Sequence, residues 1–180
     1  MPVGSSLTLL HAFDRAARWF AASEAVVDSG PRLTYGQLDE MSRRMAALLK
    51  AHGLAARRPV AILAVPSAAY LVAWFGIIRA GGLPMALHVR ESGHGLAAVC
   101  RKMKPPLLGY DLSLEALALE VATGADCIVD TVALRSAVPE MRAAGARPSA
   151  IVPDDLAGYP ADLSLAVAHE DDAAVIALSS

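Results

Sequence analysis

Short runs of aliphatic residues alternate with longer stretches of helical periodicity along most of this chain. The run 60–65 is rich in branched residues, and Pro66-Ser67 separates it from an apolar stretch that reaches Ile78. A strand, a turn and a helix repeated in this order are typical of parallel βαβ units. We therefore predict an α/β fold, with a mostly parallel sheet and helices on both of its faces.

The uncharged stretch 60–78 must also be weighed as a membrane span, because it is about long enough to cross a bilayer. Pro66 interrupts it, and Ser67 suits the N-cap of a new helix. These features favour a strand and a helix buried in a protein core, with a membrane span as the alternative. The N-terminus lacks the basic and apolar segments of a secretory signal, so we expect a cytoplasmic location.

The segment 33–38 gives the clearest helix start in the chain. Thr34 and Gln37 have the spacing of a capping box, in which the threonine hydroxyl accepts from the third helical amide and the glutamine reaches back to the cap amide. The predicted helix includes Tyr35, and Gly53 is a natural stop.

Periodicity, glycine and proline positions predict the remaining elements. The first helix is expected to turn four apolar residues toward the core, namely Leu10, Phe13, Ala17 and Phe20. All helices are predicted at 7–22, 34–52, 67–80, 93–104 and 114–122, and strands at 24–28, 32–33, 60–65, 83–89, 107–110, 126–130 and 173–178.

Regular patterns fade after residue 137. Prolines and glycines interrupt every period between 138 and 170, which favours a long connector. The apolar run 173–178 that precedes Ser179 and Ser180 indicates a buried strand. The chain is thus predicted to contain an α/β core over 7–137, a connector over 138–170, and over 171–180 a strand that leads into a loop.

Composition argues against several functional classes. The 16 basic and 18 acidic residues are interspersed, which leaves no basic stripe for nucleic acid. Cys100 and Cys127 form no C-x-x-C pair, and the five histidines lack ligand spacing. Adjacent Asp171 and Asp172 would point to opposite sides of an extended segment. We predict no metal site and no catalytic residue, and we place Cys127 in the core.

One glycine pattern imitates a dinucleotide-binding turn. Gly93-His94-Gly95 begins a G-x-G-x-x-A pattern after a strand, and Asp111 follows the next strand. However, three residues separate the strand from the first glycine, and Glu91 among them would repel a pyrophosphate. The pattern therefore favours a helix start, and a Rossmann-type nucleotide-binding domain remains the third choice of function.

Four segments, in order, carry a resemblance to a known superfamily. They are L-T-Y-G-Q-L at 33–38, V-A-I-L at 60–63, G-I-I-R-A-G-G-L-P at 76–84 and D-A-A-V-I-A-L-S-S at 172–180. The series resembles the opening of the adenylate-forming enzymes, which include acyl-CoA and aryl-CoA synthetases, luciferases and peptide-synthetase adenylation domains. In that family the first and third segments are mainly structural, which gives Thr34, Tyr35, Gln37, Gly81 and Gly82 structural roles here.

The resemblance implies a two-step reaction that uses ATP and Mg²⁺. A carboxylate attacks the α-phosphorus of ATP, and a thiol, usually that of CoA, then accepts the acyl group. Ser179 and Ser180 match the first positions of a phosphate-binding loop whose backbone amides and hydroxyls surround the phosphates. The catalytic lysine of the family comes from a later domain, and no lysine of this chain matches it.

The subfamily rests on two short segments. Residues 83–90 depart from the A-Y-V-P-x-D pattern of peptide-synthetase domains, and 177–180 look more like an acyl- or aryl-CoA ligase. This favours CoA as the acceptor and suggests a role in fatty acid metabolism, with no acid substrate named.

We accordingly interpret the chain as the N-terminal piece of such a ligase, inactive alone and without bound ATP or Mg²⁺. The alternative is a stand-alone, non-catalytic α/β module that binds a partner protein. A stop codon directly after Ser180 would favour the module, whereas Gly-Thr-Thr-Gly would favour the ligase. Apolar surface normally covered by the remainder of a ligase should also make the isolated piece self-associate.

Overall fold

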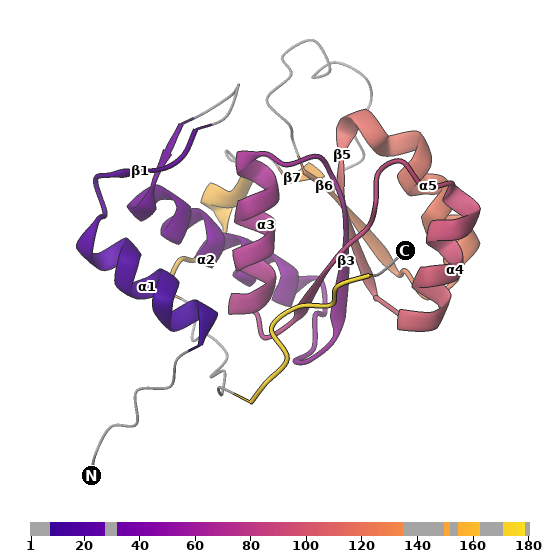
Figure 1. Ribbon diagram of the computed structural model, residues 1–180, viewed down its shortest axis with the longest axis horizontal. Helices are drawn as coiled ribbons and strands as arrows, with labels where there is room; N and C mark the ends of the chain where they lie inside the picture. Colours follow the sequence, from indigo (N-terminus) through magenta and orange to yellow (C-terminus); the bar gives the residue numbers. More distant parts are fainter. Residues whose placement is uncertain (1–7, 28–31, 135–149, 152–154, 163–170, 179–180) are drawn as a thin grey trace.

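A parallel sheet with helices on both faces forms the centre of the protein, as predicted (Figure 1). The computed structural model describes residues 8–27, 32–134, 150–151, 155–162 and 171–178. In the order β4-β3-β5-β6-β7, the strands of the sheet are β3 (Pro59–Leu63), β4 (Leu83–Ala86), β5 (Leu107–Asp111), β6 (Asp130–Leu134) and β7 (Ala150–Ile151).

Strand β3 shows how the sheet separates two cores. All five of its residues are buried, and alternate side chains point to opposite faces. Val60 and Ile62 pack with α1 (Leu9–Trp19), α2 (Tyr35–Ala51) and α3 (Ala68–Arg79). Ala61 and Leu63 pack with α4 (Gly93–Met103) and α5 (Glu115–Ala125). Such a continuous apolar strand is expected where both faces of a parallel sheet are covered.

The predicted helix starts at Thr34 and Ser67 are both present. The Thr34 hydroxyl accepts from the Gln37 amide at 3.2 Å, and the Gln37 side chain accepts from the Thr34 amide at 2.9 Å. The Ser67 hydroxyl accepts from the Tyr70 amide at 3.1 Å and begins α3. A membrane-crossing helix is not found among the described residues, because none is both long and apolar enough.

A small antiparallel hairpin precedes α2. It pairs β1 (Glu24–Val26) with β2 (Leu33–Thr34), close to the two strands predicted there. The first helix is shorter than expected, since Phe20 is its C-cap and is exposed. The prediction that Phe20 faces the core was therefore wrong, whereas Leu10, Phe13 and Ala17 are buried as predicted.

The strand predicted at 126–130 lies four residues further along the chain. Helix α5 continues to Ala125, and Asp126 takes a left-handed conformation with φ 46°. The following residues form a loop in which the Val129 amide donates to the Pro106 carbonyl at 2.9 Å, so pairing with β5 begins only at Asp130. Cys127 consequently lies half-buried in this loop instead of in a core strand.

Part of the region predicted as a connector belongs to the sheet. Strand β7 pairs in parallel with Ala133 and Leu134 of β6. The 3-10 helix η3 (Asp155–Gly158) follows, and its Leu156 is buried in the core shared by α2 and α3. Arg44 of α2 fixes this helix by donating to the carbonyls of Ala157 at 3.0 Å and Tyr159 at 2.6 Å. The rest of 138–170 lies outside the described residues, apart from 159–162.

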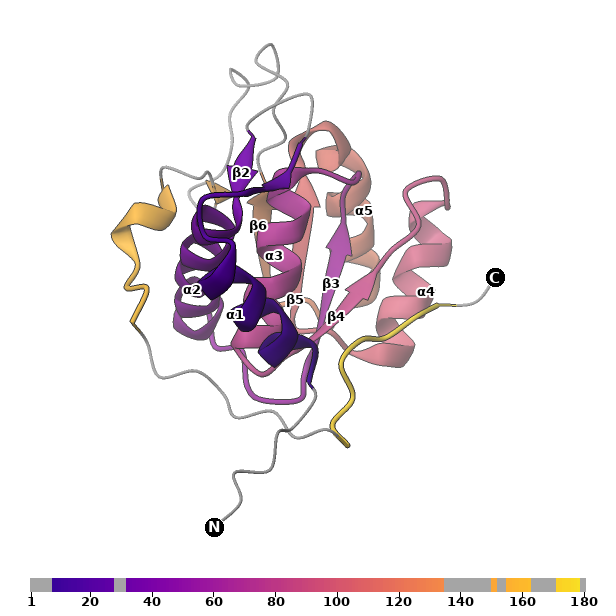
Figure 2. The same cartoon turned by 60° about the vertical axis from the view of Figure 1, so that its left-hand side comes forward.

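The segment 171–178 contains a single bridge residue and is not the buried strand that its sequence predicts. It runs beside β4 (Figure 2), where Ile176 makes an isolated parallel bridge with Met85. Val175 and Leu178 are 44% and 40% exposed. The described residues flank this segment by one strand only, so its side chains are not enclosed as those of β3 are.

Candidate functional site

The segment that leads to Ser179 and Ser180 is attached to the sheet at two points, a bridge to β4 and an ion pair with Arg57 in the loop before β3. Both serines themselves lie outside the described residues. The Ile176 amide donates to the Pro84 carbonyl at 3.0 Å, and Ile176 bridges Met85. Nearer its start, Asp172 accepts from the Arg57 guanidinium, with Nη2 and Oδ1 2.7 Å apart.

Gly81 and Gly82 form the turn between α3 and β4, the strand that segment 171–178 contacts. Gly81 has φ 81°, a left-handed conformation that favours glycine. A side chain on Gly82 would bring its Cβ within 3.0 Å of the Ile77 side chain and 3.1 Å of the Leu54 side chain. The turn therefore joins α3 to β4 in little space, which explains why two glycines occur in succession.

Backbone contacts then connect this turn to the loop before β3. The Arg57 amide donates to the Gly81 carbonyl at 2.6 Å, and the Leu83 amide donates to the Arg58 carbonyl at 2.9 Å. Arg57 itself has φ 61°. As a result, Arg57 and the first residues of β4 are fixed relative to each other at the edge of the sheet that carries 171–178.

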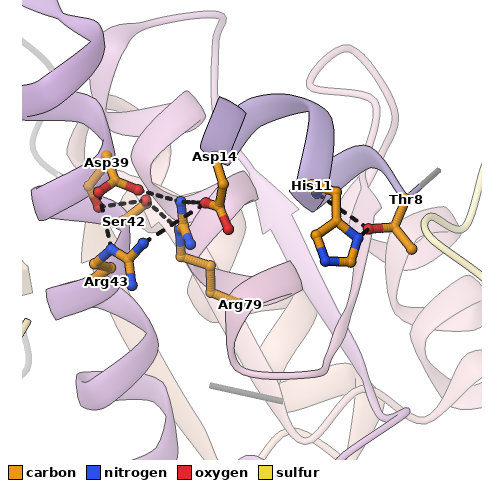
Figure 3. Close-up of polar contacts among 7 residues, drawn as sticks. All are labelled: Thr8, His11, Asp14, Asp39, Ser42, Arg43 and Arg79. Carbon is orange, nitrogen blue, oxygen red and sulfur yellow. Dashed lines mark hydrogen bonds and ion pairs between the residues drawn. The ribbon is translucent and has the colours of Figure 1, made fainter. Parts of the chain in front are cut away.

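The arginine that precedes the glycine turn has a different environment. Arg79 is fully buried at the junction of α1, α2 and α3 (Figure 3). Its Nε donates to the Ser42 hydroxyl at 2.9 Å, and its Nη2 donates to Asp14 at 2.6 Å and also to Asp39. Arg43 completes the cluster by donating to Asp39 at 2.9 Å.

The environment of Arg79 indicates a structural role. Its guanidinium lies 5.2 Å from the centroid of the Phe13 ring, which stacks on Phe75 with centroids 4.1 Å apart. Nη1 is buried and has no hydrogen-bond partner within the described structure. Because Arg79 has no exposed surface and two carboxylates balance its charge, it is placed to hold three helices together instead of binding a substrate.

Gly76, one turn earlier on α3, permits the close approach of α2. A Cβ at this position would lie 2.3 Å from Met45 Cγ and 2.6 Å from Met45 Cβ. Real Cβ atoms do not approach other atoms so closely, so only glycine fits without movement of a helix. The segment 76–84 is thus a packing and turning element along its whole length.

The first resembling segment also joins helices. Besides the capping box at Thr34, the Tyr35 amide donates to the Ser23 carbonyl and the Gly36 amide to the Ala21 carbonyl, both at 3.0 Å. These bonds attach the start of α2 to the turn after α1. A Cβ on Gly36 would lie 3.1 Å from the Ala21 oxygen, which accounts for the glycine.

The glycine pattern at 93–95 does not form a dinucleotide turn. Ser92 caps α4 by accepting from the Gly95 amide at 3.2 Å, and Gly93 packs directly against the Glu120 carboxylate. Asp111 is buried and accepts from the Ser113 amide at 3.2 Å, at the start of η1 (Leu112–Leu114). The Glu120 carboxylate beside Gly93 opposes binding of a pyrophosphate there. The Asp111 carboxylate already accepts a hydrogen bond from the Ser113 amide, which opposes its use for a ribose.

The titratable groups of the core are poorly suited to catalysis. Burial raises the pKa of Cys100 to about 11, with a smaller contribution from Cys127, and burial likewise raises the pKa of Cys127. Both thiols are therefore weak nucleophiles at neutral pH. His52 contacts the Asp130 carboxylate at the end of α2. In the described part of the chain, no three His, Cys, Asp or Glu side chains gather as metal ligands would.

Comparison with known sequences identifies the family. A sequence profile described as AMP-binding enzyme matches residues 13–180, which is nearly the whole chain. The chain belongs to the AMP-binding enzyme family. Among curated relatives, cyclosporin synthetase simA of Tolypocladium inflatum is 33% identical over 99 residues, or 55% of this chain and 1% of its own. Aldehyde reductase lnbA of Aspergillus flavus is 39% identical over 95 residues, or 52% of this chain and 9% of its own.

Solved structures agree on the fold of this chain. The anthranilate CoA ligase AuaEII, in complex with anthranoyl-AMP, aligns with all of this chain and 32% of its own, with a TM-score of 0.83 and 16% identity. A benzoate CoA ligase from Burkholderia xenovorans aligns with 92% of this chain and 31% of its own, with a TM-score of 0.72 and 20% identity. The chain thus spans about a third of these solved relatives and far less of the curated ones.

Several residues form long-range ion pairs in this chain that its sequence does not reveal. Arg57 and Asp172 lie 115 positions apart, and although Asp172 begins the last resembling segment, nothing in the sequence pairs it with Arg57. Asp14 and Asp39 belong to helix faces that sequence periodicity makes polar, yet both reach the buried Arg79. The only sequence signal for this cluster is a charged residue at the end of the otherwise apolar α3.

Proposed function

We propose that this chain is the first part of an enzyme that activates a carboxylic acid with ATP. The single observation that carries the proposal is the family match across residues 13–180. The path of segment 171–178 supports it, because that segment is held in place at the sheet edge and leads directly to Ser179 and Ser180. We assign these serines to the start of the loop that surrounds the phosphates of ATP.

For the second step, we propose transfer of the acyl group to CoA. The named functions of the solved relatives support this choice, since both are CoA ligases. Transfer to a carrier-bound thiol is the second candidate, favoured by the 33% identity to a cyclosporin synthetase. Because the solved relatives favour CoA and the curated synthetase favours a carrier, thioester formation with each acceptor decides between them. A role in fatty acid metabolism would follow only if a fatty acid proves to be the substrate.

ATP and Mg²⁺ belong to the proposed whole enzyme. The described residues offer no cluster that could hold a cation, so we assign no metal ligand in this part of the chain. What the chain supplies is the scaffold that carries the phosphate loop. Since it spans about a third of the solved relatives, we propose that the 180 residues alone do not form the acyl-adenylate.

The test is acid-dependent exchange of labelled pyrophosphate into ATP by the full-length polypeptide that contains these residues. A panel of fatty, aromatic and amino acids should include at least one that stimulates exchange. Addition of CoA, or of a phosphopantetheine-bearing carrier domain, then identifies the acceptor by thioester formation. Absence of exchange with every acid, combined with capture of a partner protein by the same polypeptide, would instead support a non-catalytic module.

Three further measurements on the isolated 180 residues test the remaining parts of the proposal and its dinucleotide-binding alternative. Tight binding of Mg²⁺-ATP by calorimetry would contradict their inactivity. Self-association is expected because apolar side chains such as Val175 and Leu178 are exposed, and light scattering that shows a monomer at high concentration would contradict it. Quenching of protein fluorescence by NADH would revive the dinucleotide-binding alternative.

A further inference from the structure

The backbone contacts of segment 171–178 leave its register weakly determined. The Ile176 amide makes one bond to Pro84, and the bridge to Met85 is isolated. The register of a strand is fixed where one face is buried, and it can slip where both faces are open. Val175 and Ala177, on either side of Ile176, are exposed, so burial gives this segment little resistance to slipping.

A second fixed point exists four residues before Ile176. Asp172 pairs with Arg57, whose backbone is itself tied to Gly81 by the 2.6 Å bond between its amide and the Gly81 carbonyl. The Arg57 side chain is 77% exposed and that of Asp172 is 26% exposed. The pair therefore adds little to the stability of the fold, but it attaches the segment to the rigid turn that begins β4.

We propose that Arg57 and Asp172 form a register clip that sets the position of Ser179 and Ser180. With Asp172 and Ile176 both anchored, only two residues lie between Ile176 and Ser179, so a slip of one residue would displace the loop by about 3 Å and reverse its side chains. Both are positioning residues, because they act through the backbone of 171–178. The inference rests on the proposed function, since it assumes that the two serines contact ATP.

An exposed arginine near a phosphate loop could instead bind a phosphate itself, and charge exchange separates the two roles. The variant that combines Arg57→Asp with Asp172→Arg restores an ion pair with the two charges exchanged. Position 57 then no longer carries the positive charge that direct binding of a phosphate would need. Recovery of function in this double variant therefore identifies the clip. Failure to recover, with both single variants impaired, would overturn it in favour of direct phosphate contact.

The kinetic experiment uses the full-length polypeptide in the pyrophosphate exchange assay. Arg57→Ala and Asp172→Asn should each raise the KM for ATP by about fivefold, the most that an exposed ion pair ordinarily contributes, and leave the KM for the acid within about twofold. The reversed pair should return the KM for ATP to within about twofold of the original. An unchanged KM for ATP in both single variants would overturn the proposed positioning of ATP.

Arg32→Ala is the matched control. Arg32 pairs with Glu24 on the hairpin, where Nη2 and Oε2 are 2.8 Å apart, and both side chains are at least half exposed. Like the clip, this pair joins an exposed arginine to a carboxylate, although through two nitrogens instead of one, and it belongs to a different part of the molecule. Its loss should leave the KM for ATP unchanged, so an equal rise in both variants would indicate a nonspecific effect of surface charge and would count against the clip.

Hydrogen exchange at the Ile176 amide tests the clip without any enzyme activity. In the same full-length polypeptide, Arg57→Ala should accelerate exchange of this amide by about fivefold, because the bond to Pro84 opens more often. Unchanged exchange would overturn the clip even if the enzyme is active. If no acid supports pyrophosphate exchange, the proposed function fails and the role in ATP positioning fails with it, while this measurement still decides whether the clip exists.

Discussion

Two segments of nearly the same composition have opposite fates in this protein. Residues 60–65 read V-A-I-L-A-V, and residues 173–178 read A-A-V-I-A-L. Residues 60–63 of the first run belong to β3 and are all buried. The second leaves Val175 and Leu178 substantially exposed and makes one bridge to the sheet.

The difference lies in the neighbours of each segment. Strand β3 pairs with β4 on one side and β5 on the other, and helices cover both of its faces. Segment 171–178 has only β4 beside it among the described residues, and only Ile176 packs against one of the cores. Apolar sequence therefore indicates a segment that is able to be buried, while burial itself depends on what the fold places around it.

Two arginines show the same contrast between a buried and an exposed environment. The largest expected effect on the free energy of unfolding concerns them. The Arg79 side chain is fully buried, whereas that of Arg57 is largely exposed. Replacing both Asp14 and Asp39 with asparagine leaves the Arg79 charge buried without a counter-ion and should lower the free energy of unfolding by about 3–5 kcal/mol. Arg57→Ala should lower it by less than about 1 kcal/mol. Urea denaturation of the chain, followed by tryptophan fluorescence, measures both.

Arg79→Met serves as the control for this interpretation. It removes the buried charge together with the unpartnered Nη1 and keeps a side chain of similar length. The two carboxylates that remain are partly exposed and still pair with Arg43, so no charge is left buried alone and this variant should lose less stability than the double asparagine variant. Equal losses would mean that packing around Phe13, and not charge balance, controls the helix junction.

The same substitution in the two similar segments gives the next largest difference. Ile62→Ala creates a cavity in the centre of the sheet and should lower the free energy of unfolding by about 2–5 kcal/mol. Ile176→Ala removes a half-buried side chain and should cost less than about 1 kcal/mol. Denaturation midpoints of the two variants provide the measurement. Comparable costs would show that 171–178 is as firmly packed as β3, contrary to its observed exposure.

Sequence reasoning succeeded where local contacts decide the structure. The capping box at Thr34 and the cap at Ser67 involve residues three positions apart, so they can be recognised directly. The alternation of strands and helices likewise predicted the parallel sheet and its covered faces. The start of β6 at Asp130 was missed because it depends on alignment with Leu107 of β5, which is distant in the sequence.

Long-range contacts explain the other failures as well. Strand β7 has two residues and is identified only by its pairing with β6. The proposed clip needs Arg57 and Asp172 to meet across 115 positions. The prediction that 173–178 is a buried strand was wrong. Its apolar pattern was read correctly, but among the described residues only β4 lies beside the segment, so its second edge is not covered.

Tight packing beside β3 gives a smaller predicted effect at Gly76. Gly76→Ala would force its new methyl group against Met45 and should lower the free energy of unfolding by about 1–3 kcal/mol. Met45→Gly in the same chain removes both the Cγ and the Cβ that the new methyl group would meet, so it should recover part of that loss. The two substitutions should therefore be non-additive in a double-mutant cycle. Additive losses would show that the contact between α2 and α3 is not what requires glycine.

Gly109 on β5 should respond in the opposite direction, with the smallest effect. It lines a small apolar cavity next to Ile62, and a Cβ there would meet the nearest atom, Cδ1 of Leu134, at an ordinary 3.5 Å. Gly109→Ala should therefore raise the free energy of unfolding by about 0.4–1 kcal/mol, by filling space and by restricting the unfolded chain. Gly82→Ala is the control, because its Cβ would be crowded at 3.0 Å and should destabilise. A loss of stability from Gly109→Ala would mean that the sheet depends on glycine at this position, although the cavity leaves room for a Cβ.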